Sequence, residues 1–301
     1  MYMKSIICIL SFFFYTYNVI GQTEIQYSKK KLRYHEEAIL QWTADIENDP
    51  NNYVAFYNRA ANKSAIGRYA EAIVDYNKAI ELNPEYVNVY NDRGVTKQDL
   101  EQHTAAIEDF NKTIEFSPGW AAPYFCRGFS RKMLEDYNGS IDDFNMALEL
   151  GPQDFNAYHN IGNCKFNLED YKGAIEEYDK AVQIFSGFAG LYYDRGYAKY
   201  TCGDFNAALD DYNKAIKLDP KDIDVYIERG IVHDSLKNYE AAIKDYTKAI
   251  ALDTEDASLY VARGNVWYKF NKESPNARLD WEQARKLGSM EVDVFLLPYS
   301  K

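Results

Sequence analysis

The residues of this chain that could do chemistry are few and widely separated. Neighbouring acids recur, as at Asp142-Asp143 and Asp210-Asp211, but such pairs are more often solvated helix faces than general acid and base couples. The motifs of nucleophilic catalysis, of metalloproteases, of phosphate loops and of calcium loops do not occur. The four histidines lie far apart in the sequence, at His35, His103, His159 and His233. The sequence therefore predicts no catalytic residue, no metal site and no cofactor, and we expect that the protein is not an enzyme.

The cysteines do not form a recognisable redox or metal motif. Three of them, Cys126, Cys164 and Cys202, follow the first 21 residues, and an odd number of thiols cannot pair completely within one chain. Neither a Cys-x-x-Cys motif nor a cysteine–histidine cluster accompanies them. We expect small thiols packed among helices, and the alternative is a redox pair or a metal site.

The first 21 residues have the features of a secretory signal peptide. Lys4 precedes an apolar and aromatic run over residues 5–20, and small or modest residues lie before Gln22. The run is short for a membrane span and is interrupted by Thr16 and Asn18. We therefore expect cleavage, export to the periplasm or the outer envelope, and no stable membrane insertion afterwards. The alternative is that residues 5–20 remain as an anchor.

The overall charge excludes one class of partner. The chain of 301 residues carries a formal net charge of −12, whereas binding to nucleic acid needs clustered lysine and arginine. Its 27 tyrosines are many for a water-soluble chain and predict aromatic packing throughout.

A spacing of 34 residues organises the remaining chain. Glycine recurs at Gly94, Gly128, Gly162, Gly196, Gly230 and Gly264, and a tyrosine lies four residues before each of them. Proline closes most units, at Pro50, Pro84, Pro118, Pro152 and Pro220. A fixed period of this length predicts a stack of similar supersecondary units rather than one compact core.

Each unit has the pattern of two helices. In the unit around Tyr192–Pro220, Tyr192 and Gly196 have helical spacing in a first helix, and Gly203 follows it as a terminating glycine would. The later residues Ala208, Tyr212 and Ala215 lie on one face of a second helix. Small residues at the helix crossing allow close approach, and the large aromatics fill the space beside it.

This pattern, Tyr/Phe-x3-Gly followed by Ala-x3-Tyr/Phe-x2-Ala and Pro, resembles the tetratricopeptide repeat over about residues 34–287. The resemblance implies an all-α fold, a right-handed α-solenoid of seven helix-turn-helix repeats. Full repeats begin at Tyr53, Val87, Ala121, Phe155, Ala189, Ile223 and Ala257. The domains expected are a signal peptide over 1–21, an N-terminal capping half-repeat over 22–52, the repeats over 53–288 and a C-terminal cap over 289–301.

Two repeats depart from the pattern, and both ends have features of caps. Ala60 replaces the glycine of the first repeat, and one residue is inserted near Lys272–Pro275 in the seventh. Residues 34–50 resemble a second helix without a first one, and residues 290–297 could form a last helix. Caps of this kind keep a solenoid soluble.

A regular charge pattern predicts a ladder of ion pairs. An arginine precedes the glycine position in six repeats, and an acid precedes the second-helix aromatic in all seven. We predict bidentate arginine–carboxylate pairs that join the helices, and the alternative is solvated surface charge. Ile161 replaces the arginine of the fourth repeat, so Glu177 should lack its partner.

The resemblance implies a binding groove lined by the first helices. Such a groove has almost no basic residues here, so the carboxylate clamp of the chaperone-binding members is not expected. Its middle is aromatic, which favours anchoring of a partner, unless these rings pack between repeats. The candidate partner-binding residues are Tyr57, Asn91, Phe125, Phe129, His159, Asn163, Phe166, Tyr193, Tyr197, Tyr200, Asn265 and Tyr268.

These observations favour a non-enzymatic scaffold that binds a partner protein or peptide in the groove, in the bacterial periplasm or cell envelope. The alternative is an envelope protein that binds glycan or peptidoglycan through the aromatic groove, because tyrosine rings also stack on sugars. Neither the identity of the partner nor the oligomeric state follows from the sequence.

Overall fold

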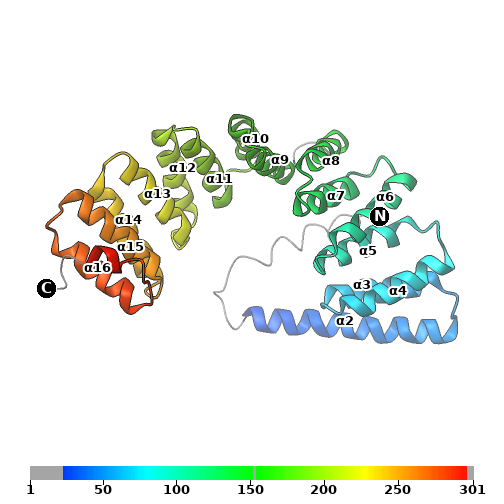
Figure 1. Cartoon of the computed structure of the whole chain (residues 1–301). Coiled ribbons are helices and arrows are strands. Elements are labelled where there is room, and N and C mark those ends of the chain that lie inside the picture. The colour runs from blue at the N-terminus through cyan, green and yellow to red at the C-terminus, as the bar shows by residue number, and fades with distance from the viewer. Residues whose placement is uncertain (1–22, 152–153, 297–301) are drawn as a thin grey trace. The chain divides into compact units, whose positions relative to one another are not determined.

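The computed structural model describes residues 23–151 and 154–296, and these residues form sixteen helices and no strand. The expected signal peptide lies outside the described residues. None of the helices in the described part is long and apolar enough to cross a membrane. The predicted all-α repeat fold is confirmed (Figure 1). The helices are α2 (Thr23–Asn48), α3 (Tyr53–Ala65), α4 (Tyr69–Leu82), α5 (Val87–Asp99), α6 (His103–Phe116), α7 (Ala121–Met133), α8 (Tyr137–Leu150), α9 (Phe155–Asn167), α10 (Tyr171–Ile184), α11 (Ala189–Thr201), α12 (Phe205–Leu218), α13 (Ile223–Ser235), α14 (Tyr239–Leu252), α15 (Ala257–Phe270), α16 (Pro275–Lys286) and α17 (Asp293–Leu296).

The described chain divides inside α9, between Asn160 and Ile161, into two compact units. In the first unit, α3 packs on α4, α5 on α6 and α7 on α8, and in the second the same holds for α11 with α12, α13 with α14 and α15 with α16. The second helix of one pair also contacts the first helix of the next, as α4 contacts α5 and α12 contacts α13. Each unit is therefore a series of helix pairs in which every pair buries its surface against its neighbours.

The recurring glycine is required where the two helices of a pair come closest. A Cβ atom added to Gly162 would lie 2.5 Å from the Tyr178 ring, and one added to Gly94 would lie 2.7 Å from the Phe110 ring. These rings are almost fully buried, with 2% of Tyr178 and 0% of Phe110 exposed. The predicted pairing of a small residue with a large aromatic is therefore confirmed, and it fixes how closely the helices approach.

Both ends of the described chain cover a neighbouring pair. At the N-terminal end, α2 is a single helix of 26 residues that packs against α3. At the other end, Phe295 of the short α17 stacks on Trp281 with ring centroids 5.0 Å apart. Val292 and Leu296 join the buried cluster around Trp281. Apolar side chains that a further repeat would otherwise cover are thereby removed from water.

The inserted residue of the seventh repeat lengthens its first helix. Helix α15 has 14 residues, whereas the other first helices whose caps are described, such as α13, have 13. The arginine-to-acid separation rises accordingly from 16 residues in the sixth repeat to 17 between Arg263 and Asp280. The pairing across the two helices is nevertheless kept, so the insertion is absorbed at the end of α15.

The turn inside each of the first six pairs has a left-handed backbone at its middle residue. Gly67 and Gly203 occupy this place in the first and fifth repeats with φ of 79° and 82°. In the second, third, fourth and sixth repeats the same position is occupied by Glu101, Glu135, Glu169 and Lys237, with φ between 59° and 63°. A residue with a Cβ atom is strained in this region by about 1–2 kcal/mol.

We expect Glu135→Gly to raise the free energy of unfolding by about 0.5–1 kcal/mol. The substitution relieves the left-handed strain, and the greater freedom of glycine in the unfolded chain offsets part of that gain. Urea unfolding followed by circular dichroism measures the change. Glu108→Gly, at an exposed position inside α6, is the control and should lower stability by about 1 kcal/mol. Equal losses from both substitutions would show that Glu135 carries no strain.

Candidate functional site

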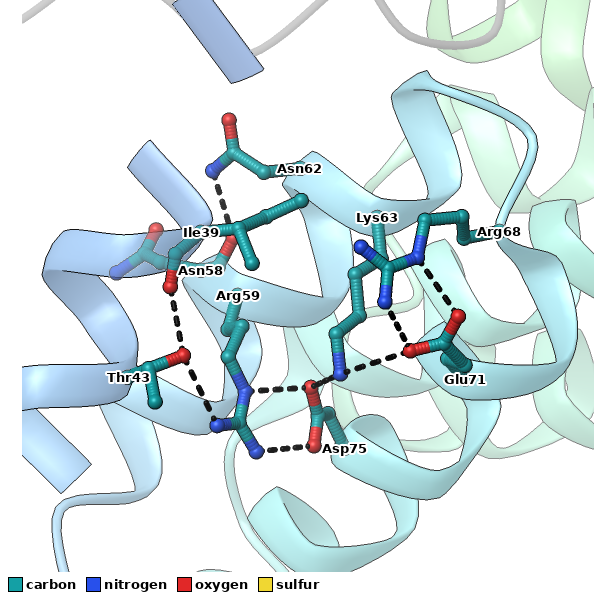
Figure 2. Close-up of polar contacts among 9 residues, drawn as sticks. All are labelled: Ile39, Thr43, Asn58, Arg59, Asn62, Lys63, Arg68, Glu71 and Asp75. Atoms are coloured by element: carbon teal, nitrogen blue, oxygen red, sulfur yellow. Dashed lines mark hydrogen bonds and ion pairs between the residues drawn. The ribbon is translucent and has the colours of Figure 1, made fainter. Parts of the chain in front are cut away.

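A ladder of buried ion pairs holds the helices in register. Arg59 of α3 makes two hydrogen bonds to Asp75 of α4, of 2.8 and 2.7 Å. The Asp75 residue is 3% exposed, and Figure 2 shows the planar guanidinium facing its carboxylate. The same bidentate contact joins Arg93 to Asp109, Arg127 to Asp143, Arg195 to Asp211, Arg229 to Asp245 and Arg263 to Asp280. The predicted ladder is therefore confirmed.

Each arginine also reaches back to the preceding second helix. Its remaining terminal nitrogen donates to a side chain that follows the buried aromatic of that helix. In the first unit, Arg93 reaches Asn77 at 2.5 Å, and Arg59 reaches Thr43 of α2 at 3.3 Å (Figure 2). In the second unit, Arg195 reaches Asp179 at 2.6 Å. One guanidinium thus joins three helices, and this link between repeats is a feature that the sequence reasoning missed.

Glu177 lacks the ladder arginine, as expected, but it is not left without a cation. Lys165 donates to one carboxylate oxygen of Glu177 at 2.7 Å, and Lys180 donates to the other at 2.9 Å. Lys165 lies four residues after Ile161, where a second cation is common: Lys63, Lys97, Arg131 and Lys199 contact the ladder acid from the same place. Glu177 is only 7% exposed, so its charge needs a nearby cation. Lys165, one helical turn after the usual arginine position, supplies it.

We expect Arg93→Gln to lower the free energy of unfolding by about 2–4 kcal/mol. The change leaves the buried Asp109 with Lys97 alone and removes the contact to Asn77. Thermal unfolding followed by circular dichroism measures the loss. The control is Arg68→Gln, which breaks the exposed pair with Glu71 and should change stability little. Similar behaviour of the two variants would contradict a structural role for the ladder.

On the first helices of the first unit, two candidate residues are held by other side chains. The Tyr57 hydroxyl donates to Asp92 at 2.7 Å, and the Asn91 amide donates to the same side chain at 3.0 Å. Asn91 is 5% exposed and Asp92 is 8% exposed. Burial raises the pKa of Asp92, and burial together with the Asp92 charge raises the pKa of Tyr57. The polar groups of this cluster are thus engaged with one another, and only Tyr57 remains half-buried.

The other candidates of the first unit are aromatic and partly exposed. Phe125 of α7 meets the buried Phe144 edge to face, with ring centroids 5.1 Å apart. One turn later, Phe129 lies beside His103, and the Lys132 ammonium lies 5.1 Å from its centroid. His159 of α9 is half-buried. The structure thus brings Phe125 and Phe129 together on one helix face and supports each of them with a neighbouring ring.

In the second unit, candidate rings form a connected series along α9, α11 and α12. Phe166 lies 5.4 Å from Tyr197, and Tyr197 lies 6.5 Å from Tyr200, between ring centroids. Tyr197 is 37% exposed, and Tyr193 of the same helix packs over Tyr212 at 6.1 Å. Phe166 and Tyr200 are half-buried, so the series presents Tyr197 supported by a ring on either side.

Of the remaining candidates of this unit, two asparagines hold buried aromatic side chains in place, and one tyrosine is exposed. Asn163 accepts a hydrogen bond from the Tyr178 hydroxyl at 2.7 Å, and Asn265 accepts one from the Trp281 indole at 3.1 Å. Both amides therefore position second-helix aromatics. Tyr268, in contrast, is 41% exposed and packs one side of its ring near Trp281.

The face of α13 beside these tyrosines is acidic. Asp224 and Glu228 are one turn apart, and burial followed by the Asp224 charge raises the pKa of Glu228. Burial and then the charges of Glu228 and Asp224 raise the pKa of Tyr193. Glu228 is not among the candidate residues that the sequence predicted. The signal available was the acid that recurs just before the ladder arginine, at Asp92, Asp194 and Glu228.

The cysteines are separate and lie in different environments. Cys126 and Cys164 are buried, and Cys202 is exposed. Within the residues that the structure describes, no group of three or more histidine, cysteine, aspartate or glutamate side chains is arranged to hold a metal ion.

Comparison with known proteins identifies the repeat. A family model described as TPR repeat matches residues 65–100 and 196–236. Two models described as tetratricopeptide repeat match residues 223–256 and residues 87–119 and 155–186. A search of curated proteins found no match.

Solved structures share the fold at low sequence identity. The C-terminal part of a TPR repeat-containing protein from Cytophaga hutchinsonii is 18% identical, with a TM-score of 0.70 over 79% of this chain and 98% of that one. A tetratricopeptide repeat protein from Parabacteroides merdae is also 18% identical, with a TM-score of 0.61 over 82% of this chain and 97% of that one. YrrB, described as a TPR protein with an unusual peptide-binding site, is 23% identical, with a TM-score of 0.53 over 61% of this chain and 94% of that one. The paired helices, the glycine–aromatic crossings and these matches together establish that the chain is a tetratricopeptide repeat protein.

Proposed function

We propose that this protein is a non-catalytic scaffold that binds a segment of a partner protein on the exposed face of its first helices. The observation that carries the proposal is the aromatic series of the second unit, in which Phe166, Tyr197 and Tyr200 lie side by side. Tyr197 is 37% exposed, whereas the second-helix aromatics, such as Tyr178 and Tyr212, are buried. Exposed aromatics that neighbouring rings hold rigid are good anchors, because few rotamers are lost on binding.

The second helices are occupied with holding the stack together, which supports a site on the first helices. Their small and aromatic side chains are buried in the helix pairs, and their acids are bound by the ladder. First-helix residues outside these contacts are the ones that can meet a partner without disturbing the fold. The peptide-binding site ascribed to the related YrrB agrees with such a role.

We expect that replacing two exposed first-helix rings abolishes capture of the partner. Tyr197→Ser/Tyr268→Ser removes rings that are 37% and 41% exposed. The measurement is chemical crosslinking of protein lacking residues 1–21 in a cell-envelope extract, followed by mass spectrometry. Circular dichroism establishes that the variant keeps the helical content of the wild type.

The matched control is Val74→Ser/Leu279→Ser, which removes exposed apolar side chains of second helices (66% and 59% exposed). Partner capture by the control but not by the tyrosine variant supports the proposal. Equal capture by both variants would place the binding surface elsewhere. Loss of capture after glycosidase treatment, with retention after protease treatment, would instead support the glycan alternative.

We further propose that the protein works outside the cytoplasm of a bacterium, because residues 1–21 have the composition of a signal peptide. Expression of the full chain in a bacterial host should yield a periplasmic protein. Intact-mass spectrometry should show that it begins at Gln22. A membrane-bound product that retains residues 1–21 would support an uncleaved anchor instead.

A further inference from the structure

A cluster of polar groups on the first-helix face of the second unit lacks the partner that its chemistry requires. We name it the Glu228 cluster, and it consists of Tyr193 of α11, Tyr212 of α12, and Asp224 and Glu228 of α13. Helices α11 and α13 are in contact, and Tyr193 packs over Tyr212 with ring centroids 6.1 Å apart. The carboxylate charge of Glu228 acts on both tyrosine hydroxyls and raises their pKa beyond the effect of burial.

An equivalent cluster in the first unit has an acid whose hydrogen-bonding capacity is met by donors of the chain itself. Tyr57 and Asp92 occupy the repeat positions of Tyr193 and Glu228, four repeats earlier in the chain. There, the Tyr57 hydroxyl donates to Asp92 at 2.7 Å, and the Asn91 amide donates to it at 3.0 Å. The acid is 8% exposed, and its charge is met by these two donors.

The Glu228 cluster keeps the tyrosine, as Tyr193, but lacks both hydrogen bonds of the equivalent cluster. Ile227 replaces the amide of Asn91, so the neighbouring side chain offers no hydrogen. Glu228 makes neither a hydrogen bond nor an ion pair with another described residue, although it is half-buried. Its carboxylate is therefore partly removed from water without a donor from the protein, which is unfavourable for a charge.

A buried hydroxyl next to this acid is unsatisfied as well. Tyr212 is 0% exposed, and its hydroxyl oxygen has no hydrogen-bond partner within the described chain. Buried polar atoms of this kind are uncommon and call for an explanation. The hydroxyl can accept one hydrogen bond and donate another, so a donor placed between Tyr212 and Glu228 would satisfy both groups.

The rings around the cluster favour a positive charge. Tyr193, Tyr197 and Tyr200 lie on one face of α11, and their π faces attract cations, guanidinium in particular. Lysine and arginine of the chain are engaged elsewhere nearby: Arg195 and Lys199 bind Asp211, and Lys269 binds Asp234. The cluster therefore combines acceptors, an unpaired carboxylate and aromatic faces, with no cation of its own among the described residues.

We propose that the Glu228 cluster binds a basic side chain, arginine above all, carried by the partner segment. The proposal rests on the proposed function and specifies its chemistry: the partner supplies the cation that this face lacks. A guanidinium can donate to the half-buried Glu228 carboxylate while its plane lies against the tyrosine rings of α11, and its charge then lies beside the buried Tyr212 hydroxyl.

The experiment titrates the full chain with N-acetyl-arginine N-methylamide and, separately, with the citrulline analogue, which has nearly the same shape but no charge. Tyrosine ring signals are followed by NMR with ¹³C-labelled tyrosine, and Tyr193→Phe and Tyr212→Phe identify their resonances. We expect the arginine probe to move these two resonances and to bind about tenfold more tightly than the citrulline probe.

Glu228→Gln should reduce this preference to about twofold or less, because the substitution removes the charge and keeps the size. The control Glu240→Gln removes an exposed acid from α14 of the same unit and should keep the preference. Circular dichroism checks the fold of both variants. Equal binding of the two probes, no shift of either resonance, or an unchanged preference in Glu228→Gln would each overturn the proposal.

These results separate this inference from the proposed function. If Tyr197→Ser/Tyr268→Ser abolishes partner capture while the probes show no preference for charge, the first-helix face binds the partner without a cation at Glu228. If the probes show the preference but capture is unaffected by the tyrosine variant, the cation site stands and the proposed function fails.

Discussion

The bidentate pairing of an arginine with a buried carboxylate is the interaction on which the regular stack depends. Each guanidinium joins the first helix of a repeat to its second helix and, through its remaining nitrogen, to the preceding repeat. A buried carboxylate deprived of its cation is strongly unfavourable, so each repeat must provide one. The fourth repeat shows how firm this requirement is, because Lys165 and Lys180 bind Glu177 where Ile161 replaces the arginine.

Contacts between the helices of a pair separate positions that vary little, where Ala60 and Ile161 are the departures, from positions that vary widely. The ladder arginine, the crossing glycine and the second-helix aromatic all make contacts that fix how the helices of a pair meet. The first-helix residue two places before the arginine also packs beside the second-helix aromatic, as Phe125 does on Phe144, but its chemistry changes from repeat to repeat. Its seven occupants are Tyr57, Asn91, Phe125, His159, Tyr193, Ile227 and Val261. Asn91 and Val261 are buried, and the other five are half-buried. Variation in hydrogen-bonding capacity, size and polarity among partly exposed side chains at one position suits recognition of an irregular partner segment.

The parts of the structure that recur in every repeat could be predicted from the sequence, because a regular period reveals them. The glycine–aromatic crossings and the arginine ladder belong to this group. The partner of Glu177 was missed because the second cation, Lys165, lies one turn beyond the position that the pattern emphasises. The burial of Asn91 was missed because it depends on Tyr57 and Asp92, which come from two repeats. Contacts of this kind follow from how neighbouring repeats pack, which the period of a single repeat does not specify.

The acid before the ladder arginine illustrates how one fold position can serve either stability or binding. With donors from its own chain, as Asp92 has from Tyr57 and Asn91, the acid closes a cluster and strengthens the contact between two first helices. With Ile227 in place of the amide and the longer Glu228 in place of the aspartate, the same position keeps its charge but loses its donors. Because the ladder already holds these repeats in register, the unsatisfied acid is tolerated without loss of the fold. A cation from outside the chain can therefore form the ion pair that Glu228 does not form within the chain. In this way one repeat acquires binding specificity while the other repeats stay unaltered.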